Sequence, residues 1–219
     1  MIERTISVRT HGRYLVEQSQ SSEPAPLLVG FHGYAERAEI QLDRLRAIPG
    51  SSRWNLVSIQ GLHRFYQRRM AEVVASWMTR EDRELALADN LDYVAAVLGA
   101  IAAEYSTTPP IVFAGFSQGV AMAFRAAVAS RIQPVAVIAV GNDIPPEIDS
   151  TALGGLSGAL LCRASDDEWY SAAKFVADRQ RLENAGVSFR AFEYPGGHLW
   201  STDVTAAAAA FLETCRAHS

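Results

Sequence analysis

The chain has few cysteines, no long apolar run and no metal-ligand spacing among its histidines. Its 219 residues include two cysteines, Cys162 and Cys215, whereas the disulfide frameworks of small secreted domains need several pairs in a shorter chain. Neither cysteine belongs to a CxxC pair, and no HExxH pattern is present. These absences disfavour a thiol-based site and a metal hydrolase, so we expect no metal and no organic cofactor.

Membrane and nucleic-acid roles also lack support. The longest apolar run, residues 206–212, is too short to cross a bilayer, and the charged N-terminus MIERTISVRT does not resemble the apolar core of a secretory signal. The formal net charge is −4, which gives no support to binding of nucleic acid. We expect a soluble cytoplasmic protein that acts on a small molecule, without an integral membrane segment, and a homodimer is left open.

The order of apolar patterns predicts one α/β domain over residues 1–219. Apolar residues make up 49% of the chain, enough for a sizeable core. Runs typical of buried strands alternate with helical periodicity, which predicts a mostly parallel sheet with helices on both faces. TISVR and the segment after it predict an antiparallel hairpin at the N-terminus, and residues 61–80 have no clear period. The expected strands are 5–9, 13–17, 27–31, 55–59, 111–115, 134–141, 158–165 and 188–194, and the expected helices are 40–48, 81–105, 118–130, 168–184 and 202–217.

The segment Gly115-Phe116-Ser117-Gln118-Gly119 fits the pattern G-x-S-x-G. An apolar strand pattern ends on it and a helical pattern begins after it, which is the context of a nucleophile elbow. The glycines suit a turn so tight that side chains beside the serine would clash. Ser117 would then stand at a helix N-terminus, where developing negative charge is favoured. The alternative is an ordinary strand-to-helix turn in which Ser117 caps the helix.

A serine nucleophile needs a base, and His198 is the candidate. It follows the last predicted strand in the sequence Pro-Gly-Gly-His, where two glycines allow a turn that brings the ring over the sheet edge. The orienting acid should follow a strand between the serine and the histidine. Asp166, Asp167 and Glu168 all stand at such a strand end, and either aspartate could instead cap the next helix.

The oxyanion hole of such a site uses two backbone N–H groups. One should belong to Gln118, the residue after the nucleophile. The other should come from the loop after the strand at 27–31, which reads His32-Gly33-Tyr34. Gly33 allows close approach of the backbone, and the N–H of Tyr34 is the candidate donor. His32 is interpreted as part of the scaffold.

Together these motifs resemble the phospholipase/carboxylesterase family of the α/β-hydrolases, which includes the acyl-protein thioesterases. The resemblance rests on FHGY at 31–34, AGFSQGVAMA at 114–123 and GGHLWS at 196–201, and it covers the chain from about residue 27 to its end. It implies the α/β-hydrolase fold, hydrolysis of carboxylic esters or thioesters by a catalytic triad, and Asp167 as the acid.

Three departures from the family pattern suggest a divergent branch. The family's first loop often carries a second glycine and an aspartate after His-Gly, where this chain has Tyr34-Ala35-Glu36. Its acid turn usually carries His-Gly and Val-Pro, where this chain has Arg163-Ala164 and Tyr170-Ser171. The substrates of the family therefore do not transfer with the triad.

Aromatic residues near these motifs could form an apolar pocket for an acyl group. The alternative is that most of them are ordinary core or surface residues. Three arginines, Arg64, Arg68 and Arg69, could hold a carboxylate. Besides a carboxylesterase, the sequence allows a binding protein without turnover or a C–C bond hydrolase on the same fold. The candidate substrate-binding residues are Phe65, Tyr66, Trp77, Trp169 and Trp200.

Overall fold

The computed structural model describes residues 1–21, 23–67, 72–132 and 135–217 and contains a seven-stranded sheet. All neighbouring strands are parallel except the pair β1 and β3, which is antiparallel. The strand order is β1 (Arg13–Glu17), β3 (Asn55–Gln60), β2 (Ala25–Phe31), β6 (Thr107–Phe116), β7 (Val135–Val140), β8 (Gly158–Ala164) and β9 (Phe189–Tyr194).

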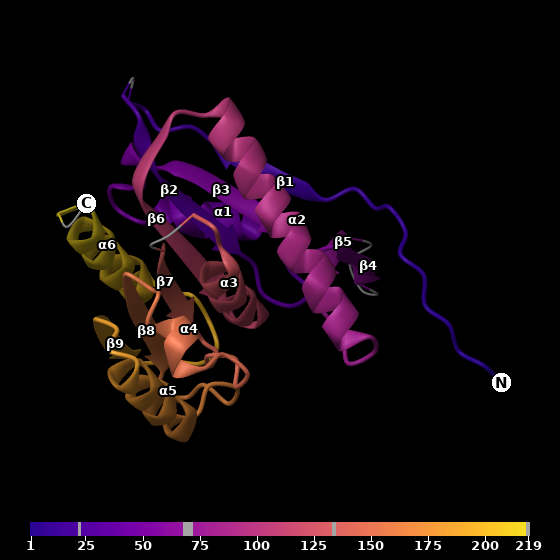
Figure 1. Cartoon of the computed structure of the whole chain (residues 1–219). Helices are drawn as coiled ribbons and strands as arrows, with labels where there is room; N and C mark the ends of the chain where they lie inside the picture. Colours follow the sequence, from indigo (N-terminus) through magenta and orange to yellow (C-terminus); the bar gives the residue numbers. More distant parts are fainter. Residues whose placement is uncertain (22, 68–71, 133–134, 218–219) are drawn as a thin grey trace.

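Helices cover both faces of this sheet (Figure 1). Residues of α1 (Ala38–Ala47) and α6 (Thr202–Ala217) belong to the core on one face. The opposite core contains residues of α2 (Arg83–Glu104), α3 (Gln118–Ala129), α4 (Ser150–Leu153) and α5 (Ala172–Asn184). The predicted mostly parallel sheet with helices on both faces is confirmed.

The strands read as continuous apolar runs because alternate side chains enter two different cores. In β7, Val137 and Ala139 pack into the core with α2 and α3, whereas Ile138 and Val140 pack into the core with α1 and α6. This two-sided burial is the physical meaning of the runs. The expected strands from residue 13 onward overlap observed strands, with ends that differ by a few residues. Pro134, at the expected start of β7, lies outside the described residues.

The N-terminal antiparallel pairing takes a different form from the predicted hairpin. Residues 5–9 form no strand, and Ile6 is 87% exposed. The antiparallel partner of β1 is β3, with Tyr14 opposite Ile59. The edge of a sheet already present is a better partner for β1 than an isolated hairpin, which is marginal in water.

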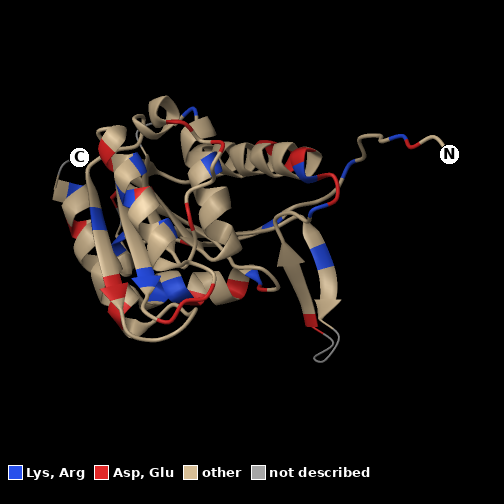
Figure 2. Ribbon diagram, turned by 90° about the horizontal axis from the view of Figure 1, so that it is seen from below, with Lys and Arg blue, Asp and Glu red and all other residues tan. Residues whose placement is uncertain are grey.

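Residues 61–80, which have no clear period, contain a second, two-stranded sheet. It consists of β4 (His63–Gln67) and β5 (Glu72–Ser76), and it projects from the main body (Figure 2). Ala75 of this pair is bonded to the loop after β2: its N–H donates to the carbonyl of Glu36 (2.9 Å), and its carbonyl accepts the N–H of Ala35 (3.0 Å). Figure 2 also shows acidic and basic residues mixed along the helices.

Helix α2 is long and apolar enough to cross a membrane by length and composition alone. Core helices of soluble proteins pass the same test, and here Val94, Val97, Leu98 and Ile101 pack into the core beneath it. These side chains form the buried apolar face of the helix.

Candidate active site

Ser117 stands at the turn between β6 and α3 with an unusual backbone. Its φ is 51° and its ψ is −123°, a region that residues with a side chain rarely adopt. Two hydrogen bonds hold this turn: the N–H of Ser117 donates to the carbonyl of Val140 (2.9 Å), and the side-chain amide of Asn142 donates to the carbonyl of Ser117 (3.1 Å). The predicted sharp strand-to-helix bend is therefore present, and the Ser117 side chain makes no cap hydrogen bond to α3.

The glycines on either side of Ser117 are required by close packing. A Cβ on Gly115 would lie 2.6 Å from the backbone of Gly119 and Val120. A Cβ on Gly119 would lie 2.1 Å from the carbonyl oxygen of Phe31. The sequence interpretation of these two glycines is confirmed.

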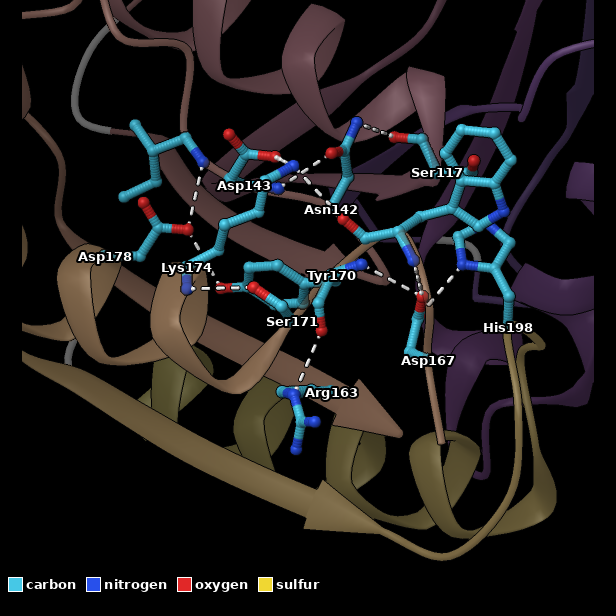
Figure 3. Close-up of polar contacts among 12 residues, drawn as sticks. Ser117, Asn142, Asp143, Arg163, Asp167, Tyr170, Ser171, Lys174, Asp178 and His198 are labelled. Atoms are coloured by element: carbon cyan, nitrogen blue, oxygen red, sulfur yellow. Dashed lines mark hydrogen bonds and ion pairs between the residues drawn. The ribbon is translucent and has the colours of Figure 1, made fainter. Parts of the chain in front are cut away.

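His198 and Asp167 form a hydrogen-bonded pair at the carboxyl end of the sheet (Figure 3). Nδ1 of His198 donates to Oδ2 of Asp167 at 2.9 Å. The carboxylate also accepts the N–H groups of Trp169 (2.8 Å) and Tyr170 (2.9 Å) on its other oxygen. With Nδ1 as the donor, Nε2 of the neutral ring is the free acceptor.

The pKa of Asp167 lies below its usual value although the side chain is buried. Burial alone would raise this pKa, but hydrogen bonds from Tyr170, His198 and Trp169 lower it overall. The carboxylate is thus ionised at neutral pH and is a fixed acceptor behind the imidazole.

The pair lies directly beside the bend that carries Ser117. A Cβ on Gly141 would meet Cε1 of His198 at 3.0 Å and Oδ2 of Asp167 at 3.4 Å, and Gly141 follows the Val140 carbonyl that holds the Ser117 N–H. The ring of Phe116 lies 5.1 Å from that of His198 between centroids. The structure therefore brings Ser117, His198 and Asp167 to one edge of the sheet.

Three carboxylates follow β8, and in the described structure Asp167 is the one that contacts His198. Asp166 and Glu168 are exposed. The capping alternative is wrong for both aspartates, because α5 begins at Ala172 rather than at the expected residue 168. Its cap is Ser171, whose hydroxyl accepts the N–H of Lys174.

The loop after β2 is held by a partly buried ion pair. Arg44 donates to both oxygens of Glu36 at 2.6 Å, and Glu36 also accepts the N–H of Gly33 at 2.7 Å. Burial would raise the pKa of Glu36, but Arg44 and the Gly33 N–H lower it overall. Among the described residues no backbone acceptor is found for the N–H of Tyr34 or of Gln118, so both predicted donors remain available.

His32 has the scaffold role that its position suggested. Nε2 accepts the N–H of Gly61 (2.9 Å), and Nδ1 donates to the carbonyl of Gly33 (2.6 Å). Burial is the main cause that lowers the pKa of His32. The ring therefore stays neutral and joins the strand ends of β2 and β3.

The side chain of Gln118 has a role that sequence reasoning missed. Its carbonyl oxygen accepts the Trp77 N–H (2.9 Å) and the Ser76 hydroxyl (3.1 Å), and its amide donates to the Met78 carbonyl (3.0 Å). It therefore ties the end of β5 to the bend at Ser117. No local signal in the sequence pairs these distant segments.

The aromatic residues proposed for substrate binding lie in different environments, some exposed and some packed in the core. Tyr66 and Trp169 are 73% and 70% exposed, and the ring of Phe65 packs at a tilt against that of Tyr34, with 5.6 Å between centroids. Phe65 and Tyr66 lie within β4, whereas Trp169 lies in the loop after β8.

Trp77 and Trp200 pack against the two hydrophobic cores, and their predicted contact with substrate stays a prediction. Trp77 is fully buried and packs on Phe31 in the core. Trp200 packs against the core on the α6 side, and its indole N–H donates to Thr205. Large aromatic side chains gain most from burial, which accounts for the position of Trp77 in the core.

The predicted arginine cluster contributes one described residue. Arg64 donates to the carbonyl of His11, whereas Arg68 and Arg69 lie outside the described residues. Within the part of the chain that the structure describes, no group of three or more His, Cys, Asp and Glu side chains is arranged to hold a metal ion.

No protein-family model matches this chain, and no curated protein matches it by sequence. Solved structures match over nearly its whole length. Esterase PE8 covers 94% of this chain and 100% of its own at 21% identity, with a TM-score of 0.73. The chain has the α/β-hydrolase fold.

Two further structures agree with this fold. A Bacillus cereus carboxylesterase covers 93% of this chain and 94% of its own at 16% identity, with a TM-score of 0.73. Zea mays acyl-protein thioesterase 2 covers 93% and 99% at 15% identity, with a TM-score of 0.66. At these identities the likeness concerns the fold alone.

Proposed function

We propose that this chain is a serine hydrolase that cleaves carboxylic esters with Ser117 as nucleophile, His198 as base and Asp167 as orienting acid. The observation that carries the proposal is the 2.9 Å hydrogen bond between His198 and Asp167 beside the positive-φ bend at Ser117. The esterase and thioesterase names of the similar structures support the same reaction class.

In the first half of the reaction, His198 takes the proton of the Ser117 hydroxyl as its oxygen attacks the ester carbonyl. The tetrahedral intermediate collapses, and the protonated ring gives its proton to the leaving alcohol. Asp167 stays ionised and stabilises the imidazolium. The product of this half is an acyl-enzyme on Ser117.

The oxyanion of each tetrahedral intermediate is stabilised by the N–H groups of Tyr34 and Gln118. Each donor contributes on the order of 3 kcal/mol to the transition state. The Glu36–Arg44 ion pair keeps the Tyr34 loop in place through the Gly33 N–H.

In the second half, water replaces the alcohol. His198 takes a proton from the water, which attacks the acyl-enzyme, and the ring then returns the proton to Ser117. The carboxylic acid leaves. Every proton is carried by the same imidazole, so the cycle needs no cofactor.

The acyl group of the substrate would lie against apolar side chains around the site. Tyr34 and Trp169 are exposed in the loops after β2 and β8, and Phe65 on β4 packs against Tyr34. A series of p-nitrophenyl esters and matched thioesters of increasing acyl length measures how far this surface is used, and separates ester from thioester preference.

The test is covalent labelling with a fluorophosphonate probe together with hydrolysis of p-nitrophenyl acetate. We expect the unchanged protein to be labelled and active, and Ser117→Ala to lose both properties. Ser130→Ala, at the other end of α3, is the matched control and should keep both. EDTA should leave the activity unchanged.

Two results would overturn the proposal. Binding of esters without labelling or turnover would favour the binding-protein alternative. Activity retained by Ser117→Ala would exclude the serine as nucleophile.

A further inference from the structure

A buried carboxylate on α5 takes no part in the proposed reaction. The side chain of Asp178 is 3% exposed. One of its oxygens accepts two hydrogen bonds, from the N–H of Ile144 (3.1 Å) and from the hydroxyl of Tyr170 (2.9 Å). Figure 3 shows Asp178 and Tyr170 together with Asn142, Ser117, Asp167 and His198.

The first partner belongs to the loop between β7 and α4, residues 141–149. In this loop Asn142 donates to the carbonyl of Ser117 at 3.1 Å. Ile144 lies two residues further on and is fastened to α5 at both backbone groups: its N–H donates to Asp178, and its carbonyl accepts from Arg181 at 2.7 Å. The loop whose Asn142 contacts the backbone of Ser117 is therefore fixed to α5 through Ile144.

The second partner belongs to the loop between β8 and α5. The N–H of Tyr170 donates to Asp167 at 2.9 Å, and its hydroxyl donates to Asp178 at 2.9 Å. The ring of Tyr170 is buried and meets Phe175 edge to face. Tyr170 thus holds the acid with its backbone and reaches Asp178 with its side chain.

We propose that Asp178 is a positioning residue that fastens the loop of Asp167 and the loop contacting Ser117 to the same helix, and so sets the acid and the nucleophile relative to each other. This inference rests on the proposed function. A single carboxylate can serve two loops because it has several lone pairs to accept hydrogen bonds.

The charges around Asp178 make its burial costly, which argues against a role in stability alone. Burial is the main cause that raises its pKa to about 6, and the charge of Asp143 acts in the same direction. Asp143 is itself paired with Lys174 at 3.0 Å. The guanidinium of Arg181, with a nitrogen 3.6 Å from an oxygen of Asp178, lowers the pKa of Asp178 and partly offsets these two effects. An apolar residue would avoid the penalty.

The experiment compares kcat, KM and the pH profile of three variants on a p-nitrophenyl ester. Asp178→Ala should lower kcat by about 10- to 100-fold with little change in KM, because the reacting groups are misplaced while the binding surface is kept. Tyr170→Phe, which removes one hydroxyl, should give a smaller loss. Asp178→Asn keeps an acceptor oxygen and should restore most of the activity.

The pH profile separates positioning from a purely structural effect. If Asp167 is held less firmly in Asp178→Ala, the imidazolium is less stabilised, and the acid limb of kcat/KM moves to lower pH. Tyr170→Phe should add little to the loss already present in Asp178→Ala, because both changes break the same hydrogen bond.

The control is Asp149→Ala, which removes the cap of α4 at the end of the same loop. It should lower the melting temperature and leave kcat and the pH profile unchanged. All variants are measured well below their melting transitions, and Tyr170→Phe tests the inference if Asp178→Ala does not fold.

The inference is overturned if a folded Asp178→Ala keeps the kcat of the unchanged protein, or if Asp178→Asn loses as much activity as Asp178→Ala. The activity of Ser117→Ala distinguishes failure of the proposed function from failure of this inference alone. Retained activity in that variant overturns the proposed function itself, whereas loss in that variant with normal kcat in Asp178→Ala overturns only this inference.

Discussion

The backbone at Ser117 stores strain that its surroundings have to offset. A non-glycine residue in such a conformation costs on the order of 1–3 kcal/mol. The hydrogen bonds from Ser117 to Val140 and from Asn142 to Ser117 hold it in place. The bend can persist only if the chain before and after it packs without obstruction, which depends on the two glycines.

The first prediction concerns Gly119. Gly119→Ala would place a methyl group 2.1 Å from the carbonyl oxygen of Phe31, and backbone atoms cannot move aside cheaply. We expect a loss of at least about 3 kcal/mol in the free energy of unfolding, measured by urea titration.

Gly99→Ala on α2 is the matched control for this change. A Cβ there meets no atom within 4 Å, and alanine favours a helix by about 0.5–1 kcal/mol over glycine. The control should therefore gain stability. Equal stability of the two variants would contradict the steric argument.

The second prediction distinguishes the adjacent aspartates. Asp167→Asn should lower kcat by about 10⁴-fold, because an amide can favour the wrong tautomer of the histidine it contacts. Asp166→Asn changes an exposed residue that makes no described contact with His198 and should leave kcat near normal. Steady-state kinetics on one ester decides between them, and equal loss in both variants would contradict the assignment.

At the scale of elements, the hairpin of β4 and β5 is joined to the active-site bend by one side chain. The side-chain oxygen of Gln118 accepts hydrogen bonds from Ser76 and Trp77 at the end of β5. Gln118→Leu would leave the buried Trp77 N–H without its acceptor, at a cost of about 1–3 kcal/mol.

The third prediction follows from this contact. In Gln118→Leu we expect faster hydrogen exchange at the amide of Trp77 and along β5, with little change along β8. Gln180→Leu, at an exposed site on α5, is the control. Unchanged exchange at Trp77 would show that the hairpin is held by other contacts.

For the whole molecule, the buried Asp178 links stability to pH. Its pKa is raised to about 6, so between about pH 4 and 6 the folded protein binds this proton more tightly than the unfolded chain does. The free energy of unfolding that comes from Asp178 is therefore largest below pH 4 and falls as the pH rises through 6.

The fourth prediction isolates this effect. Between pH 4 and 7 the unchanged protein should lose about 2 kcal/mol of unfolding free energy relative to Asp178→Asn, which cannot ionise. Denaturant titrations at several pH values measure the difference. Parallel curves for the two proteins would contradict the raised pKa.

Part of the site was predictable because its signals are local. The bend at Ser117 is encoded by Gly115 and Gly119 within five consecutive residues, and its strand and helix adjoin it. His198 was recognisable from its place after the last strand. The contacts of Trp77 and Trp200 were not, because their neighbours come from distant parts of the chain.

The order of strands and helices, the two-sided burial of the sheet and the bend at Ser117 were determined by the sequence alone, because each depends on neighbouring residues and on the period of apolar side chains. Only the tertiary structure decided the partner of β1, the hydrogen bond between Asp167 and His198, and the hydrogen bonds that Asp178 accepts from two loops. Those outcomes depend on contacts between groups that are far apart in the sequence, and no local sequence pattern predicts such contacts.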